Sequence, residues 1–416
     1  MNNYTADLYE VKRGINTYSD KLTNGLGKPV KKLAKQMIYG IIKSSSCILS
    51  DISDALMEDI KKANTIERLC RGLKEKLPAD ITVNYLNMVK ESLPKDPVIL
   101  VDDTDIVKPY GEKFESLGVV RDGSSENKTY EKGYMVTEMV GLTEKEKHPV
   151  SLFSHIHSSL EKNYKSTNAV LYAGIERVLR TVNGKPCFVF DRGYDSNALY
   201  NLLHRKGADF IVRIKENRKI FHKGKWFRAT VLRDSRKGKI STQVWFNGKK
   251  IDCYASHLNV KLTSSRQPVR LLLVYGIGET PMMLVTSKPI NSKEDAVGIL
   301  RTYMSRWRIE EYFRFKKEEY GFESIRVRTL RAMNNINRFL SYAITFSGLL
   351  IEGMDRKLLA IKAILHAKAI KKKIRFWYYQ MAKGIREILK HAKCGIREYL
   401  GIEVRSRHKQ LSFFKC

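Results

Sequence analysis

The sequence predicts an α/β protein with helical regions at both ends, and three observations lead to this fold class. Between residues 97 and 215, short apolar runs typical of strands alternate with amphipathic stretches typical of helices. From 216 to 288, short alternating runs are punctuated by glycines, which indicates a β-rich insertion within the α/β domain. Helical periodicity covers residues 1–95 and returns from Ser292 to the C-terminus.

The N-terminal region is expected to be helical. Apolar residues from Ile48 to Ile60 recur every four positions, which predicts a helix over 48–62. Asn64 followed by Glu67 resembles a capping box that opens a second helix ending near Leu77. Basic residues, among them Arg68 and Arg71, flank this pair. Two interpretations stay open, a helix-turn-helix unit that binds DNA and a plain helical hairpin with solvated basic faces.

The α/β part follows in a regular order. Strands are expected at 98–101, 134–142, 149–157, 187–190 and 210–214, and helices at 168–181 and 196–206. Ser292 has the properties of an N-cap, with Glu294 and Asp295 in the first turn of the helix that follows. The predicted domains are 1–95 (helical, DNA-binding), 96–215 (first part of the core), 216–290 (insertion), 291–350 (last part of the core) and 351–416 (basic and helical).

The charge balance indicates a polyanionic partner. The 416 residues include 76 Lys and Arg against 44 Asp and Glu, a net charge of +32. Such an excess attracts nucleic acid or an anionic membrane surface. No apolar run is long enough to span a bilayer, and residues 340–351 are interrupted by polar side chains typical of a core helix. Met1 is followed by polar residues rather than a signal peptide, so we expect a soluble cytoplasmic protein that binds nucleic acid.

Several kinds of site have no support in the sequence. The six cysteines include no C-x-x-C pair, so they are expected to be buried or incidental thiols rather than a disulfide framework or zinc ligands. No phosphate-binding G-x-x-x-x-G-K-[ST] motif is present, so no nucleotide cofactor is expected. His155 and His157 share a strand face, but no third metal ligand accompanies them.

Two carboxylates follow short apolar strands. Asp102 comes after residues 98–101, and Asp191 comes after residues 187–190. Functional side chains in an open α/β sheet gather at the carboxyl ends of the strands, so these two face each other if their strands are neighbours. Paired carboxylates suit Mg²⁺. The alternative is that both are turn formers or helix caps.

The region around residue 310 carries a polar stripe. Tyr303, Arg306, Glu310 and Lys317 lie at offsets of 3, 7 and 14 from the first. On one continuous helix, at about 100° per residue, they fall within a sector of roughly 60° over about 21 Å. A phenol, a guanidinium, a carboxylate and an ammonium group suit phosphoryl transfer on DNA. The alternative is a solvated helix face held by salt bridges.

This spacing matches the YREK signature, and the chain resembles the DDE transposases of the insertion-sequence-4 type. Residues 284–289 (Leu-Val-Thr-Ser-Lys-Pro) and 191–194 (Asp-Arg-Gly-Tyr) also look like that family. Asp102-Asp103-Thr104 resembles its first acidic motif, with Asp102 the better match and Asp103 the alternative. The resemblance covers residues 97–350.

The resemblance implies an RNase H-like catalytic core interrupted by a β-strand insertion. It implies that Asp102 and Asp191 lie on adjacent central strands and join Glu310 around two Mg²⁺ ions, for which Mn²⁺ substitutes. It implies a cut-and-paste transposase that cleaves DNA at inverted-repeat ends, forms a hairpin intermediate and transfers the ends into target DNA. A homodimer in a synaptic complex and a prokaryotic, nucleoid-associated protein are implied as well. Tyr303, Arg306 and Lys317 would bind backbone phosphates.

The chain departs from the family at one position. Where well-known members place a Trp that helps hold a flipped base, this chain has Met282, which lacks the stacking surface. Trp226 and Trp245 of the insertion are the alternatives for this contact.

Further basic residues are candidates for DNA contacts. Arg213 and Lys215 end a predicted strand, and a solvated strand end is the alternative for them. The tail combines basic residues 371–373 and Arg375 with aromatic residues 376–379, and its apolar residues recur at helical intervals through Leu389, so we expect both DNA contacts and packing or dimerisation. Two other functions stay open, a non-catalytic DNA-binding protein of the same ancestry and a structure-selective nuclease that performs no strand transfer.

Overall fold

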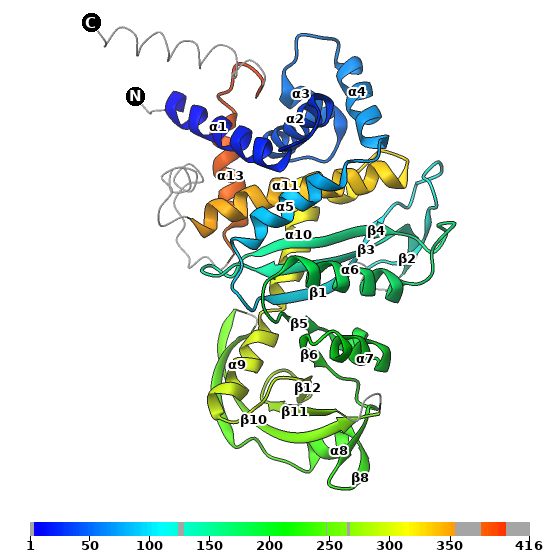
Figure 1. Cartoon of the computed structure of the whole chain (residues 1–416), viewed down its shortest axis with the longest axis vertical. Coiled ribbons are helices and arrows are strands. Elements are labelled where there is room, and N and C mark those ends of the chain that lie inside the picture. The colour runs from blue at the N-terminus through cyan, green and yellow to red at the C-terminus, as the bar shows by residue number, and fades with distance from the viewer. Residues whose placement is uncertain (1–3, 124–128, 247, 264–266, 354–375, 397–416) are drawn as a thin grey trace, which may run out of the picture.

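The computed structural model describes residues 4–123, 129–246, 248–263, 267–353 and 376–396. A helical layer lies above a large sheet, and the part of the chain from β7 to β12 forms a lobe at the opposite end (Figure 1). The fold is therefore mixed α/β with a helical N-terminal region, which confirms the predicted class.

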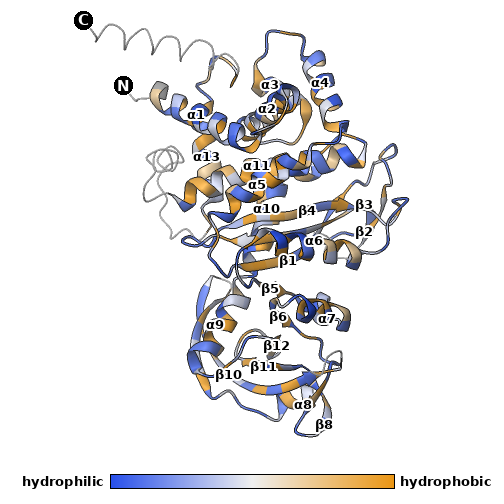
Figure 2. Cartoon of the chain, in the orientation of Figure 1, coloured by the Kyte–Doolittle hydropathy of each residue, from blue (hydrophilic) through white to orange (hydrophobic). Residues whose placement is uncertain are grey.

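The helical layer joins segments from both ends of the chain. It contains α1 (Tyr4–Leu22), α2 (Lys28–Ser44), α3 (Leu49–Leu56), α4 (Lys62–Lys74), α5 (Ala79–Lys90), α11 (Leu330–Glu352) and α13 (Tyr378–Leu389). α1, α2, α4, α5 and α13 all pack against the long α11 or against one another. Figure 2 shows the hydrophobic residues along α11, and most of that helix is buried.

Two predictions for this region are wrong. The helix predicted over 48–62 ends at Leu56, because Met57 adopts a left-handed conformation (φ 50°), and Ile60 is exposed. The next helix begins at Lys62 without a side-chain cap, so Asn64 and Glu67 form no capping box.

One mixed sheet runs through the rest of the molecule. Its strands are β1 (Val98–Val107), β2 (Gly118–Arg121), β3 (Tyr130–Leu142), β4 (Pro149–His157), β5 (Cys187–Phe190), β6 (Asp209–Arg213), β7 (Lys219–His222), β8 (Lys225–Arg228), β9 (Ile240–Phe246), β10 (Lys249–Leu262), β11 (Pro268–Tyr275) and β12 (Met282–Thr286). Their order is β2-β3-β1-β5-β6-β12-β11-β10-β7-β8, with β4 on β3 and β9 on β10. The pairs β1–β5 and β5–β6 are parallel, and all other pairs are antiparallel. All four residues of β5 are buried, as expected of a parallel strand covered on both faces.

The connections carry the remaining helices. They are α6 (Thr167–Thr181), the 3-10 turn η1 (Arg192–Tyr194), α7 (Asn197–Arg205), α8 (Ala229–Asp234), α9 (Lys293–Met304), α10 (Trp307–Tyr320) and the 3-10 turn η2 (Phe322–Ser324). Ser292 caps α9 in a full capping box with Asp295, which confirms the predicted cap. Residues 216–288 are mostly strands, as predicted, but they include α8, and β12 pairs with β6 of the core. The domain bounds stay predictions.

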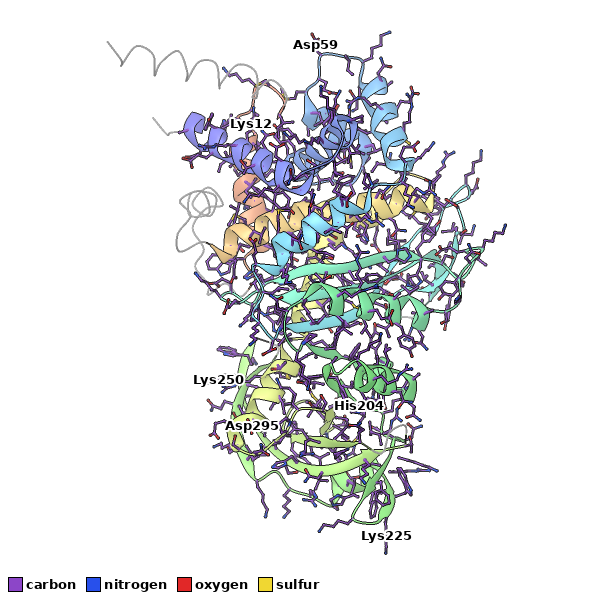
Figure 3. The ribbon with its side chains drawn as sticks, in the orientation of Figure 1. Lys12, Asp59, His204, Lys225, Lys250 and Asp295 are labelled. Carbon is purple, nitrogen blue, oxygen red and sulfur yellow. The ribbon has the colours of Figure 1, made fainter. Side chains whose placement is uncertain are left out.

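The outer surface of the lobe carries many long side chains, with Lys225 and Lys250 at its edge (Figure 3). None of the helices in the described part of the chain has the length and hydropathy to cross a bilayer. The five cysteines in that part of the chain are all free thiols.

The aromatic residues of the C-terminal region pack into the core. Phe376 and Tyr378 are buried, and the rings of Tyr378 and Phe315 of α10 stack at 5.3 Å. Of the two roles expected of the tail, base stacking and packing, Phe376 and Tyr378 take the packing role, because their faces are already covered. The basic residues 371–373 and Arg375 lie outside the described residues.

Candidate active site

Strand pairing brings Asp102 and Asp191 to the same edge of the sheet. β1 and β5 are parallel neighbours, and Val98 pairs with Cys187, an offset of 89 positions. Continued along the two strands, this register places Asp102 level with Asp191. The two carboxylates also interact electrostatically, since Asp191 raises the pKa of Asp102. In contrast to the prediction, β1 does not end before the acidic motif, and Asp102 lies within the strand.

Arg306 joins this pair to Glu310. Its Nη1 donates to Oδ2 of Asp102 at 3.1 Å, and its Nη2 donates to Oε1 of Glu310 at 2.5 Å. The side chain of Arg306 is 18% exposed, whereas that of Glu310 is 52% exposed. One guanidinium therefore bridges two carboxylates that are more than 200 positions apart in the chain.

Tyr303 completes the arrangement from the other side. Its hydroxyl donates to Oδ1 of Asp191 at 3.2 Å. The predicted single helix is wrong here, because α9 ends at Met304 and α10 begins at Trp307. Tyr303 thus reaches the site from α9, and Glu310 reaches it from α10, with Arg306 at the break between them.

The environment shifts the pKa values of these groups in different directions. Burial raises the pKa of Asp102 to about 7, although the Arg306 guanidinium acts to lower it. Burial and the Asp191 carboxylate raise the pKa of Tyr303 to about 12, so its phenol stays protonated at neutral pH. Burial by itself would lower the pKa of Arg306, but the carboxylates of Glu310, Asp102 and Asp191 together raise it above the ordinary value.

Asp103, the alternative first acid, belongs to a different environment. It pairs with Thr137 across β1 and β3. Burial raises the pKa of Asp103, and hydrogen bonds from Thr137 and Tyr194 oppose this rise by a smaller amount. No contact joins it to Arg306 among the described residues, whereas Asp102 has one. The geometry therefore favours Asp102 over Asp103 as the partner of Asp191 and Glu310.

Lys317 lies apart from this cluster. Its ammonium group is 3.0 Å from Glu323 and 3.5 Å from Asp105, toward the far end of β1. It is 20% exposed, so a DNA phosphate can reach it only in competition with these acids.

The donor set suits a hard divalent cation. Three carboxylates supply oxygen ligands of the kind that Mg²⁺ prefers, and Asp102 is half-buried. In the described part of the chain, however, no three acidic, His or Cys side chains form a ready metal-binding group. Arg306 instead lies between Asp102 and Glu310 and donates to both carboxylates.

The basic residues predicted to bind DNA have mixed positions. Arg213 ends β6 and acts electrostatically on Tyr303, so it lies near the acid cluster. The side chain of Lys215 is exposed, while its backbone N–H donates to Asp195 at 2.9 Å. Arg68 donates to Gln36 at 2.5 Å and pairs with Glu58 within the helical layer, and Arg71 pairs with Glu67. Arg68 is therefore engaged in packing α4 onto α2.

The remaining candidates from the sequence are the possible base-contacting residues and the two histidines of β4. Met282 is 6% exposed, so its side chain is buried away from any base, while Trp226 and Trp245 are about half exposed. His157 shares a hydrogen bond with Thr137 and packs beside His155, in a polar contact rather than a metal site.

Sequence reasoning missed the ion pair that holds α10 on the sheet. Lys316 donates to Oε2 of Glu138 at 2.9 Å, and neither side chain is more than 1% exposed. Glu138 pairs directly with Asp102 across β1 and β3, and it also accepts from Ser151 and Ser154. A lone carboxylate within the apolar run 134–142 was the signal that could have revealed this site.

Comparisons with known proteins identify a family for this chain. A solved structure described as "Cryo-EM structure of piggyBac transposase synaptic complex with hairpin DNA" is similar to the chain at 10% sequence identity and a TM-score of 0.46, over 100% of this chain and 85% of that one. No curated protein matches the chain. The family model described as "Transposase DDE domain" matches residues 93–344, which is more than half of the sequence. The chain therefore belongs to the transposase DDE domain family.

Proposed function

We propose that this protein is a cut-and-paste transposase of the insertion-sequence-4 type with an RNase H-like core. It would cleave DNA at the inverted-repeat ends of a mobile element and transfer those ends to target DNA as a homodimer. The observation that carries the proposal is the convergence of Asp102, Asp191 and Glu310 on Arg306 and Tyr303. Family membership supports the transposase class, and the YREK spacing supports the subgroup.

Asp102, Asp191 and Glu310 are the residues that would hold two Mg²⁺ or Mn²⁺ ions. When bound, such ions supply Lewis-acid stabilisation of the attacking and leaving oxygens in an in-line displacement at phosphorus. Glu310 is half exposed and lies on the first turn of α10, so its side chain can reorient as Arg306 moves.

The other residues would position the DNA. Tyr303 keeps its proton at neutral pH, so it acts as a hydrogen-bond donor to a phosphate oxygen rather than as a nucleophile. Arg306 stays charged and would pass from the carboxylates to a backbone phosphate as DNA enters the site. Lys317 and Arg213 would contact phosphates on either side.

The hairpin step needs a side chain that holds the flipped base. The position of the family Trp is filled by a buried Met282, so base capture would fall to Trp226 or Trp245 of the insertion.

The test is cleavage of DNA that carries the gene's own flanking sequence, with Mg²⁺, by the wild type and by Glu310→Gln. The matched control is Glu311→Gln, since Glu311 is the next residue on α10 and pairs with Arg314 rather than with Arg306. We expect paired cuts in the wild type and the control, and none in Glu310→Gln, which should still bind DNA.

Other results would change the assignment. Cuts that are followed by no strand transfer would favour a structure-selective nuclease. DNA binding without cuts in any variant would favour a non-catalytic DNA-binding protein. Equal cleavage by Glu310→Gln and the wild type would contradict the proposed acid cluster.

A further inference from the structure

A small cavity lies at the edge of the sheet, apart from the acid cluster. It has a volume of about 40 Å³ and is lined by residues of α5, β4, α6 and α11. Ser154 on β4 pairs with Glu138, which in turn pairs with Asp102. At about 4.8 Å per strand, the cavity lies roughly 10 Å from the Asp102 backbone across the sheet.

Two arginines line this cavity from opposite helices. Arg177 comes from α6 and Arg338 from α11, and both are half-buried. Neither guanidinium makes a hydrogen bond or an ion pair with any residue that the structure describes. Two half-buried arginines elsewhere have such partners, since Arg218 pairs with Asp195 and Arg386 pairs with Glu319.

The two positive charges are close enough to influence each other. Burial and the charge of Arg338 lower the pKa of Arg177. Burial, Arg338 and Arg177 also lower the pKa of His155, although a hydrogen bond with the side chain of Asn334 opposes them. Two cations that share a half-buried position without an anion are unfavourable, so the cavity lacks a negative charge.

The nearest carboxylate does not supply this charge. Glu138 accepts from Ser151 and Ser154, which line the cavity, but its partner is the ammonium group of Lys316. Because that ion pair is buried and complete, Glu138 has no charge left to balance the arginines.

We propose that this cavity binds a phosphate group between Arg177 and Arg338. Guanidinium groups match the geometry of phosphate oxygens, and Thr82 and Ser341 also line the cavity. Since a water needs about 10–15 Å³, a cavity of about 40 Å³ has room for a small group such as a phosphoryl group. The ligand is thus a phosphoryl group, either a free phosphate or one unit of a DNA backbone. The proposal does not depend on the DNA-cleaving function.

The first test is thermal unfolding of the full-length protein in phosphate and in chloride at equal ionic strength. Arg177→Gln and Arg338→Gln are the variants, and Arg180→Gln and Arg331→Gln are the controls on exposed positions of the same two helices. We expect phosphate to raise the melting temperature of the wild type and the controls by about 3 °C more than it raises that of the variants.

The same measurement separates a binding site from a structural role. In chloride, the two variants should be at least as stable as the wild type, since each removes a repulsion. An equal phosphate effect in all five proteins would overturn the proposal, because the phosphate would then act on the general positive charge. Variants that are much less stable than the wild type in chloride would overturn it as well.

A second measurement identifies the source of the phosphate. Duplex DNA is titrated against the same five proteins at several salt concentrations. If Arg338→Gln lowers affinity severalfold more than Arg331→Gln and reduces the salt slope by about one, the ligand is a DNA backbone phosphate. If both bind DNA alike while the phosphate effect on melting is lost, the ligand is free phosphate.

Discussion

Replacement of Lys316 by Met should destabilise the whole fold, whereas the same change at the neighbouring Lys317 should not. Lys316 Nζ lies 2.9 Å from Glu138 Oε2, donates to Asn337 at 2.8 Å and is 1% exposed. Lys317 is 20% exposed and makes partly solvated ion pairs. The two positions therefore provide a matched pair on one helix.

The expected magnitude follows from burial. Removing one partner of a buried ion pair leaves an uncompensated charge and costs about 3–5 kcal/mol of the free energy of unfolding. A whole protein is stable by only about 5–15 kcal/mol, so this is a large part of the total. At about 2 °C per kcal/mol, the melting temperature should fall by roughly 6–10 °C. For Lys317→Met, about 1 kcal/mol or less is expected, because solvent screens its ion pairs.

The assay is urea unfolding followed by circular dichroism, together with the double variant Lys316→Met and Glu138→Gln. The double variant should be more stable than Lys316→Met alone, since the Glu138→Gln change removes the unpaired charge and keeps one oxygen acceptor for either Ser151 or Ser154. A loss below about 1 kcal/mol for Lys316→Met, or equal losses at positions 316 and 317, would refute the reasoning.

Three further predictions concern function and pH. Lys317→Ala should reduce cleavage of DNA ends at least tenfold while the melting temperature changes little. If the melting temperature falls as far as for Lys316→Met, Lys317 stabilises the fold instead of contacting DNA. Arg306→Gln should raise the affinity for Mn²⁺ severalfold in the absence of DNA, because the change frees Asp102 and Glu310 from the guanidinium. Electron paramagnetic resonance measures this affinity, and an unchanged value would contradict the bridging geometry. Burial lowers the pKa of His148 to about 3, so the unfolded chain, with a His pKa near 6.5, binds this proton more readily than the folded chain. The stability contributed by neutral His148 is complete above pH 6.5 and is lost as the pH falls, so the free energy of unfolding should be lower by about 2 kcal/mol at pH 5. Urea unfolding of His148→Gln should not show this decrease, whereas the exposed control His257→Gln should show it as the wild type does.

Local patterns determined much of the secondary structure. Strands β4 and β5 have the bounds predicted from the sequence, because their apolar runs are short and are flanked by turn or polar residues. The Ser292 cap was also predictable, since capping depends on residues within one turn. The spacing of Arg306 and Glu310 predicts side chains one helical turn apart, and the two residues do form an i, i+4 ion pair.

Long-range packing decided the rest. Whether Asp102 lies beside Asp191 depends on the pairing of β1 with β5, which no local pattern encodes over 89 positions. The spacing singled out Lys317 but did not show that Lys316 is the buried one, and only the docking of α10 on the sheet buries Lys316 and leaves Lys317 partly exposed. The break at Arg306 likewise follows from tertiary structure, since residues 303–317 have helical periodicity throughout. Composition and spacing therefore determined the types of residue and the local elements, while the geometry of the acid cluster arose from contacts between distant segments, because burial and charge pairing depend on the whole fold.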